Sequence, residues 1–557
     1  RPAGGFVSQP EPRTIGSFAR GKQVVAGHLL FAGHLVNAPD EMLWNVAAPT
    51  NAFTAEINGF SWLDDLAALG DREARLTAQK WLLGWIAAYG NGRGPGWTPD
   101  LTGRRLIRWI NHALFILNGQ EADATLAFYR SLAQQTIFLA HRWQGASPGL
   151  PRFEALVGLI YAGLALTGME EHVEPAVKAL AHECESQIDA EGGIPTRNPE
   201  ELLEVFTLLT WAASALSEGG RRARGEHLAA IERIAPTLRA LRHSDGGLAR
   251  FHGGGRGIEG RLDQALAASG VRAAQQVGLA MGYARLSSGR TNIVMDAARP
   301  PQGAASAGAH ASTLAIELTS GRRPLLVNCG SGAHFGEEWR RAGRATPSHS
   351  VLCLDGLSSS RLGAERNAAP GAGALLVETP RDVRLQKLVE EGSTGLVGSH
   401  DGYRASHGLS HIRRLDLSHD GRTLMGEDSL AAISEGDQKR LSRRLDQTSL
   451  QGIPFVIHFH LHPEVDSALD LGGTAVSLAL KSGEIWIFRY SGQAELSIEP
   501  SFYLEKTRLK PRAAKQVVLT GRALDYATRI RWSLAKAQDT PTAIRDLETD
   551  ALTVLPF

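Results

Sequence analysis

Two histidines and an asparagine are spaced so that neighbouring strands could bring them together. His310 lies in the segment 308–314, Asn328 in 325–330 and His349 in 347–356. Residues 316–323 alternate apolar and polar side chains and close on a Gly turn, which predicts a strand followed by a tight turn. The three side chains are therefore expected to project from adjacent strands, where they could bind a metal ion or hydrogen-bond to one another.

The same stretch resembles the C-terminal domain of the heparinase II/III-like polysaccharide lyases. In that family the corresponding segments read His-x-His-x-Asp, Leu-Leu-Val-Asp-x-Gly and His-Asn-Thr-Leu, and they supply a metal site beside the active-site cleft. His310 corresponds to the second family histidine and His349 to the last, while Asn328 replaces the aspartate. The first family histidine, often a catalytic one, is replaced by Gly308.

Two interpretations of His310, Asn328 and His349 remain open. They could hold a structural zinc ion, although two imidazoles and an amide make a weaker zinc site than a set with a carboxylate. Alternatively, they form a hydrogen-bonded cluster that joins two strands, which is the interpretation we favour. We expect no cofactor to be required in either case.

The resemblance also implies a reaction, the β-elimination of a uronic-acid polysaccharide. The carboxylate of the uronate must be neutralised, the C5 proton must be removed, and the leaving O4 must be protonated. In the family, Asn or His on a helix of the toroid neutralises the carboxylate, and Tyr or His transfers the proton. Candidates for these roles can be located in four segments of the chain.

Two of these segments belong to the helical half. Arg152 stands where the family has Gly-Asn-His before a helix and could clamp a carboxylate, with Glu154 beside it as a ligand contact or a structural partner. Residues 192–201 resemble the family's Gly-Gly and Ser-Pro-x-Tyr stretch, which makes Arg197 and Asn198 candidate substrate-binding residues. The family tyrosine is missing; Glu201 is nearest to its place and could transfer a proton, or could simply compensate the helix dipole.

A Gly-rich loop over 243–255 provides two further candidates. Glycines allow backbone to approach a ligand closely. Asp245 could contact substrate, and His252 could take part in catalysis. No Lys-Ser/Thr pair follows the Gly triplet, so the loop is not a phosphate-binding loop.

The last segment, 399–414, resembles the Asp-Gly-Tyr and Gly-x-x-His-x-Arg pattern of the family. Tyr403 and His407 are the candidates for proton transfer, and His411 for substrate binding. The alternative is a β-turn with a packed tyrosine and an arginine–carboxylate network.

The elements that must position these residues change at about residue 280. Before it, apolar residues recur at helical spacing, and after it short alternating segments are separated by Asp-Gly, Ser-Gly and Gly-Gly turns. We therefore predict an N-terminal extension over 1–55, an incomplete (α/α) toroid over 56–280 and an antiparallel β-sandwich over 281–557. The toroidal closure is what the resemblance implies. The expected helices are 74–88, 106–117, 124–141, 152–166, 173–188, 202–216 and 226–241.

Composition limits the classes of partner. The 557 residues carry 59 Lys and Arg against 58 Asp and Glu, so the chain is not a polycation for nucleic acid. Three cysteines without a CxxC pair argue against a disulfide framework. No stretch reaches the ~18 apolar residues of a membrane span.

The leading hypothesis is a carbon–oxygen lyase that cleaves an acidic polysaccharide or oligosaccharide between toroid and sandwich. A glycoside hydrolase that uses carboxylates such as Glu154, Glu201 or Asp245 is one alternative. A glycan-binding protein without activity is another, because the family tyrosine and first histidine are missing. A bacterial periplasmic or cytoplasmic location and a homodimer are compatible with the sequence.

Overall fold

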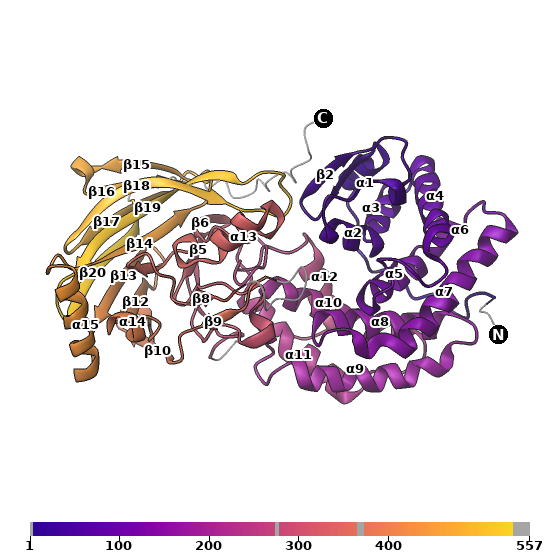
Figure 1. The fold of residues 1–557 in the computed structure, drawn as a ribbon, viewed down its shortest axis with the longest axis horizontal. Coiled ribbons are helices and arrows are strands. Elements are labelled where there is room, and N and C mark those ends of the chain that lie inside the picture. The colour runs from indigo at the N-terminus through magenta and orange to yellow at the C-terminus, as the bar shows by residue number, and fades with distance from the viewer. Residues whose placement is uncertain (1–3, 273–277, 365–372, 538–557) are drawn as a thin grey trace.

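The computed structural model describes residues 4–272, 278–364 and 373–537. Helices fill the N-terminal half and strands the C-terminal half, and the two domains lie end to end along the long axis (Figure 1). This confirms the predicted helical toroid followed by an antiparallel β-sandwich. The helices of the first domain are α1 Phe18–Val25, α2 Asn51–Asn58, α3 Trp62–Leu69, α4 Arg72–Tyr89, α5 Pro99–Asn111, α6 Ala113–Leu117, α7 Ala122–Arg142, α8 Leu150–Ala165, α9 Val173–Gln187, α10 Pro199–Glu218, α11 Gly225–Ala240 and α12 Arg261–Ser269.

Two glycines allow the central helices of the toroid to approach closely. A Cβ on Gly158 of α8 would lie 2.4 Å from the Cα of Gly103 of α5. Any larger side chain at this crossing would push the helices apart, because packed helices cannot share the same volume. Helix α8 also packs against α9 and α10, so it occupies the middle of the helical array.

The second domain contains two large sheets in which all neighbours run antiparallel. Its strands are β3 Tyr283–Ser288, β4 Thr291–Asp296, β5 Ile316–Ser320, β6 Arg323–Val327, β7 Leu352–Leu354, β8 Arg361–Leu362, β9 Leu376–Glu378, β10 Val383–Glu390, β11 Ser393–His400, β12 Ser410–Ser418, β13 Thr423–Ala431, β14 Ile453–Leu461, β15 Asp466–Asp470, β16 Ala475–Ala479, β17 Ile485–Ser491, β18 Ala494–Tyr503, β19 Arg512–Ala523 and β20 Ala527–Lys536. One sheet has the order β10-β11-β12-β13-β20-β17-β16-β15, and the other β18-β19-β14-β6-β5-β4-β3, with β7 paired to β14.

The remaining elements are a hairpin in the helical half and three helices in the sandwich half. A short hairpin of β1 (His28–Phe31) and β2 (His34–Asn37) belongs to the N-terminal half. The sandwich carries the helices α13 (Glu337–Arg344), α14 (Arg404–His407) and α15 (Glu435–Gln447). Figure 1 places α13 at the end of the sandwich that faces the toroid, and α14 and α15 toward the opposite end.

The core of the sandwich contains a charged network as well as apolar side chains. Burial alternates along β12, as expected for a strand with one face toward a core. Arg413 of β12 donates through Nε to Asp428 of β13 at 2.8 Å, and through Nη1 to the carbonyls of Leu314 and Ser350. His411 lies 2.7 Å from the same carboxylate. The network therefore ties one sheet to segments that flank the other.

The boundaries of two elements differ from the sequence prediction. The helix predicted over 106–117 is wrong in its limits, because α5 begins at Pro99 and a break at His112 separates it from α6. Helix α12 ends at Ser269 and strand β3 begins at Tyr283. Several strands of the sandwich, among them β10, β18 and β19, were not expected from the sequence because one or both of their faces are polar.

Candidate functional site

A buried ion network joins the two domains. Arg197, in the loop before α10, donates through Nη2 to Asp296 at the end of β4, at 2.6 Å. Its other N–H groups reach backbone carbonyls, including those of Met281 and Arg299 at 3.0 Å. The second carboxylate oxygen of Asp296 lies 3.0 Å from Nε2 of His252. Arg197 and His252 are thus engaged with protein groups at the domain junction.

Hydrogen bonds fix the tautomers of three imidazoles in this network. Nδ1 of His252 accepts the backbone N–H of His310 at 3.1 Å, so the proton of His252 resides on Nε2, facing Asp296. Nδ1 of His349 lies 2.8 Å from the carbonyl of Ala345 and is protonated, which leaves Nε2 as an acceptor. Nδ1 of His310, 3.0 Å away, donates to it. Nε2 of His310 therefore carries a lone pair.

The pKa values agree with neutral imidazoles around an ionised carboxylate. Burial lowers the pKa of His252 and of His310, and it lowers the pKa of His349 to about 3. Burial alone would raise the pKa of Asp296, but the charge of Arg197 and the hydrogen bonds from His252 and Ser312 outweigh it and hold that pKa below its usual value. The network therefore has a single formal ion pair, Arg197 with Asp296.

The predicted metal ligands are engaged with one another and with backbone. Oδ1 of Asn328 accepts the backbone N–H of Ser350 at 2.8 Å, and the hydrogen bond from Nδ1 of His310 to Nε2 of His349 occupies one nitrogen of each ring. Within the described ranges, no three His, Cys, Asp or Glu side chains are grouped to bind a metal. The donor set as arranged does not fit a zinc ion.

A partly exposed polar strip, here called the seam, borders the buried network. It consists of Thr196, Asn198, Glu200, Glu201 and Lys506. Asn198 caps α10, since its Oδ1 accepts the backbone N–H of Glu201 at 3.2 Å, and Pro199 supplies the preset φ of the first helical position. Glu201 in turn accepts the hydroxyl of Thr196 at 2.6 Å. The start of α10 thus presents an amide and a carboxyl group side by side.

The sandwich contributes the other edge of the seam. Lys506, in the turn between β18 and β19, forms an ion pair with Glu200 of α10. Glu200 also accepts the backbone N–H of Gly255 at 3.1 Å. These contacts connect the helical domain, the Gly-rich loop and the sandwich at one place.

Gly308 leaves open space next to the seam. A Cβ at this position would meet no atom within 4 Å. A Cβ on the adjacent Gly253 would lie 3.1 Å from the carbonyl of Gly308 and 3.9 Å from Nδ2 of Asn198. The position at which the family carries its first histidine is therefore open and close to Asn198.

A second acidic group influences the seam from α8. Glu154 accepts two guanidinium nitrogens of Arg104, from α5, at 2.9–3.1 Å. Burial raises the pKa of Glu154, and Arg104 opposes the shift. Burial also raises the pKa of Glu201; the Thr196 hydroxyl opposes this shift, and the charge of Glu154 adds to it. Glu154 and Glu201 are thus electrostatically coupled.

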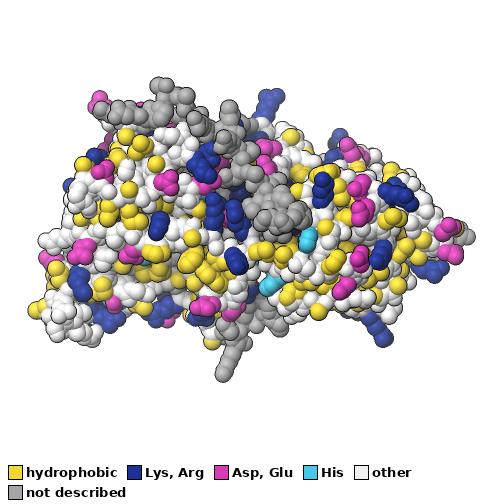
Figure 2. Space-filling model, turned by 90° about the horizontal axis from the view of Figure 1, so that it is seen from above, with side chains coloured by type: hydrophobic (Ala, Val, Ile, Leu, Met, Phe, Trp, Pro, Cys, Tyr) yellow, Lys and Arg dark blue, Asp and Glu magenta, His cyan; other side chains and the backbone are white. Residues whose placement is uncertain are grey.

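The hairpin β1–β2 gives the junction a second contact between the domains. A Cβ on Gly33, at the hairpin tip, would lie 2.5 Å from the Cβ of His334 in the sandwich. Burial lowers the pKa of His334, and the charges of Lys506 and Glu200 act on it as well. Viewed from above, Figure 2 shows several Lys and Arg side chains near the line where the two halves meet.

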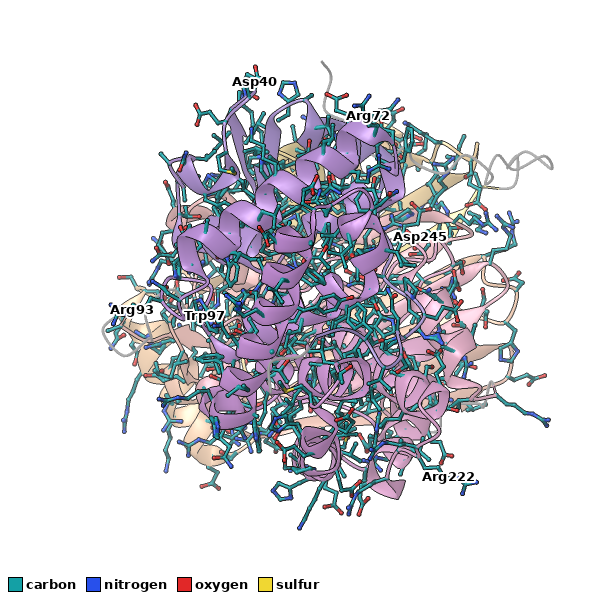
Figure 3. The ribbon with its side chains drawn as sticks, turned by 90° about the vertical axis from the view of Figure 1, so that its right-hand side faces the viewer. Asp40, Arg72, Arg93, Trp97, Arg222 and Asp245 are labelled. Carbon is teal, nitrogen blue, oxygen red and sulfur yellow. The ribbon has the colours of Figure 1, made fainter. Side chains whose placement is uncertain are left out.

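Arg152 and Asp245 have surroundings of their own. Arg152 donates to the carbonyl of Ala146 at 2.8 Å and lies 3.4 Å from Glu183. Asp245 accepts the backbone N–H of Gly247 at 2.8 Å and lines a polar cavity of about 220 Å³ that contains no seam residue. Figure 3 shows Asp245 at one flank of the molecule.

The candidates from segment 399–414 are buried in the sandwich. Tyr403 is 1% exposed and donates to the carbonyl of Leu357 at 3.2 Å, and burial raises its pKa well above the usual value. His407 lies 2.9 Å from Asp355, and burial lowers its pKa. His411 belongs to the Asp428 network. The structure therefore does not bring Arg152, His252 and Tyr403 to one surface. It does bring Asn198 and Glu201 into contact, and the charge of Glu154 acts on Glu201.

Sequence reasoning missed three residues of this region, Arg104, Asp296 and Lys506. Each meets its partner across at least 50 positions of the chain: Glu154, Arg197 and Glu200. No local sequence motif predicts such pairs. Asp296 could have been suspected, because it is a carboxylate at the end of a predicted apolar strand.

Comparison with known proteins identifies the second domain. Residues 271–533 match the family model described as heparinase II/III-like, C-terminal. The C-terminal domain is a heparinase II/III-like domain. The resemblance first noted in the segment 308–356 is confirmed. Within the part of the chain that the structure describes, no helix is both long and apolar enough to cross a membrane.

The whole architecture recurs in solved lyase structures. Heparinase III superposes with a TM-score of 0.70 at 14% identity, covering 95% of this chain and 87% of that one. A heparan sulfate lyase HepC mutant from Pedobacter heparinus gives a TM-score of 0.61 at 14% identity, covering 95% and 84%. At this identity the likeness concerns the fold.

A curated relative is much nearer in sequence. FtsZ-localized protein C of Caulobacter vibrioides is 29% identical over 554 residues, which is 97% of this chain and 91% of the relative. Its name refers to a location and does not state a reaction.

Proposed function

We propose that this protein binds an acidic polysaccharide at the seam and cleaves it by β-elimination. The proposal depends above all on one observation: at the junction of a lyase fold, the first turn of α10 presents Asn198 and the raised-pKa carboxyl of Glu201 together. A raised pKa makes a carboxyl group easier to protonate, which suits a residue that must accept a proton and return it. The buried network of Arg197, Asp296 and His252 would hold the loop before α10 in place.

The chemistry assigns roles to three seam residues. The Nδ2 of Asn198 makes no hydrogen bond within the described residues and would donate to the uronate carboxylate, which makes the C5 proton more acidic. Glu201, as carboxylate, would take this proton; the C4–O4 bond then breaks as the C4–C5 double bond forms. Protonated Glu201 would return the proton to the leaving O4. Lys506 would attract the anionic chain.

The test measures two products on one set of samples. The protein is incubated with glycans that contain uronate, and ultraviolet absorbance of the unsaturated product is recorded together with new reducing ends. Absorbance with new ends supports a lyase. New ends alone point to a hydrolase that uses Glu154 and Glu201, and binding without either product points to a silent glycan-binding protein.

Gly308 offers a sharper arm of the same test. The variant Gly308→His adds an imidazole into open space beside Asn198, where the family places one. If the seam is a weakened lyase site, turnover should rise at least about tenfold, which is less than the about 10²–10⁴-fold that a well-positioned acid–base group contributes. Ala309→His, one position away and directed into buried surroundings, serves as the control. Equal turnover of Gly308→His and wild type on every glycan would argue against catalysis at the seam.

A second candidate function follows from the curated relative. We infer that the protein localises with FtsZ, as the name of that relative states for a protein matching 97% of this chain. In this case the seam would bind glycan without cleaving it, consistent with Gly308 and the missing tyrosine. A fluorescent fusion expressed in Caulobacter vibrioides with labelled FtsZ tests the location: overlapping signals support it, and a uniform distribution contradicts it.

A further inference from the structure

An aromatic pair is exposed on the sandwich near the seam. Phe502 of β18 is 47% exposed, and its ring lies 4.9 Å from that of Trp339 of α13, at an interplanar angle of 88°. In this edge-to-face arrangement, ring surface that is not covered by the partner stays open to solvent. Trp339 and Phe502 are called the aromatic platform below.

The exposure of Phe502 follows from strand alternation. Its neighbour Tyr503 points inward, where its ring stacks with the Arg250 guanidinium at 4.0 Å and meets His462. Phe502 must therefore point outward. An outward position tolerates any polar residue, so the presence of a large apolar ring beside a second aromatic residue suggests a binding surface.

The end of β18 and the turn after it connect the platform to the seam. Phe502 lies four residues before Lys506, which pairs with Glu200 of the seam. The backbone N–H of Leu504 donates to the carbonyl of Cys329 at 2.8 Å, which anchors this end of β18 on the loop that leads to α13. A chain-like ligand leaving the seam past Lys506 would reach Phe502 next.

The charges around the platform suit an anionic ligand. The turn between β18 and β19 contains Glu505, Lys506, Arg508 and Lys510. Glu505 pairs with Arg508 at 3.0 Å, and Lys506 pairs with Glu200. Lys510 is exposed and forms no ion pair within the described residues, so it remains available to an external carboxylate or sulfate.

We propose that the aromatic platform is a subsite for an acidic sugar unit of the glycan bound at the seam. One pyranose ring would stack its C–H face on Phe502, because the face of an aromatic ring carries partial negative charge and attracts electron-poor hydrogens. The carboxylate or sulfate of the same unit would lie toward Lys510. The inference rests on the proposed function, since it extends the seam to longer chains.

The experiment compares short and long ligands on the full chain. Dissociation constants are measured for oligogalacturonates and for heparan-sulfate oligosaccharides of about two and about eight units, with wild type, Phe502→Ala and Lys510→Gln. We expect the long ligand to bind wild type about tenfold more tightly than the short one, and Phe502→Ala to lose most of that gain. Lys510→Gln should lose less, and its loss should vanish at high salt. Tyr526→Ala, a similarly exposed aromatic residue near α15, is the matched control and should bind as wild type.

The outcomes separate the subsite from the proposed function. If wild type prefers long ligands and Phe502→Ala keeps the full preference, the platform proposal is wrong while glycan binding stands. If wild type binds neither series at either length, the proposed function fails and the subsite with it. If Phe502→Ala instead reduces binding to vesicles that contain phosphatidylglycerol, and not to glycans, the platform is a lipid contact and the proposal is overturned.

Discussion

The junction between the domains has two adjoining regions built from similar residues with opposite properties. In the buried network, Asp296 is ionised, fully covered and paired with Arg197 and His252. In the seam, Glu201 is partly exposed, contacts the hydroxyl of Thr196 and has a raised pKa. The pKa values of carboxyl groups at the same junction are therefore shifted in opposite directions, downward for Asp296 and upward for Glu201.

The difference between the two carboxyl groups distinguishes a residue that holds the fold from one that could transfer a proton. A carboxylate whose hydrogen-bonding capacity is used by cations stays ionised and fixes backbone, as Asp296 does for the loop before α10. A carboxyl that burial disfavours in its charged form can exchange a proton with a ligand. The His-rich buried network would therefore be expected to govern folding, and the seam to govern activity.

The largest expected effect is on the buried side of this comparison. Asp296→Ala leaves the Arg197 guanidinium buried without a counter-ion, and breaking such a pair should lower the free energy of unfolding by about 3–5 kcal/mol. Urea unfolding at neutral pH measures it. Asp382→Ala, which removes an exposed pair with Arg384, should leave stability nearly unchanged. Equal stability of the two variants would show that the Asp296 network does not support the fold.

Glu201→Gln tests the other side. Turnover should fall by about 10²–10⁴-fold if Glu201 transfers the proton. The free energy of unfolding should not fall together with turnover. The pKa of Glu201 is higher in the folded protein than in the unfolded chain. Its carboxyl group therefore stabilises the folded state below the unfolded pKa, and this contribution is lost as pH rises through the folded pKa. The neutral amide escapes that loss, so unfolding at pH 8 should require slightly more urea than in wild type. Glu226→Gln, which changes an exposed carboxylate in the first turn of α11, is the control and should keep its turnover.

The sequence predicted the architecture better than the site. Helical spacing in the first half and turn-separated strands in the second follow from local side-chain order, and they predicted the order of a helical domain followed by an antiparallel sandwich. The segment 192–201 led to Asn198 and Glu201, which do lie together. Arg152 and Tyr403 were chosen by analogy with family positions, but their partners, Glu183 and Leu357, are distant in sequence and fix them elsewhere. Long-range pairing of this kind leaves no local pattern.

Acid should destabilise the sandwich through its buried histidines, which are His349 and three residues in or just after β14. Burial lowers the pKa of His349 and His462 to about 3 and of His458 and His460 to about 4. These folded-state pKa values lie below the unfolded histidine value of about 6.5, so unfolding takes up protons at acid pH. The stability that the neutral imidazoles contribute is therefore complete above pH 6.5 and is lost as pH falls toward the folded-state values. On the order of 2 kcal/mol for each imidazole should be lost by pH 5.

Urea midpoints measured from pH 7.5 to pH 5 test this expectation. Glu201 and Glu154 contribute with the opposite sign, since their raised pKa values favour the folded state at low pH. A midpoint that is constant over this range would mean that the imidazoles titrate normally, which would contradict their burial in neutral form.

The smallest expected effect concerns metal. His310 donates to His349, and Asn328 accepts from backbone, so a zinc ion would have to break two hydrogen bonds and would gain no negatively charged ligand. We therefore expect well below one zinc per purified chain by mass spectrometry, and the same melting temperature before and after dialysis against a chelator. Stoichiometric zinc, with a chelator-dependent fall in melting temperature, would mean that the imidazole pair opens to bind metal; in that case Asn328→Asp should bind it more tightly, because the carboxylate supplies the missing charge.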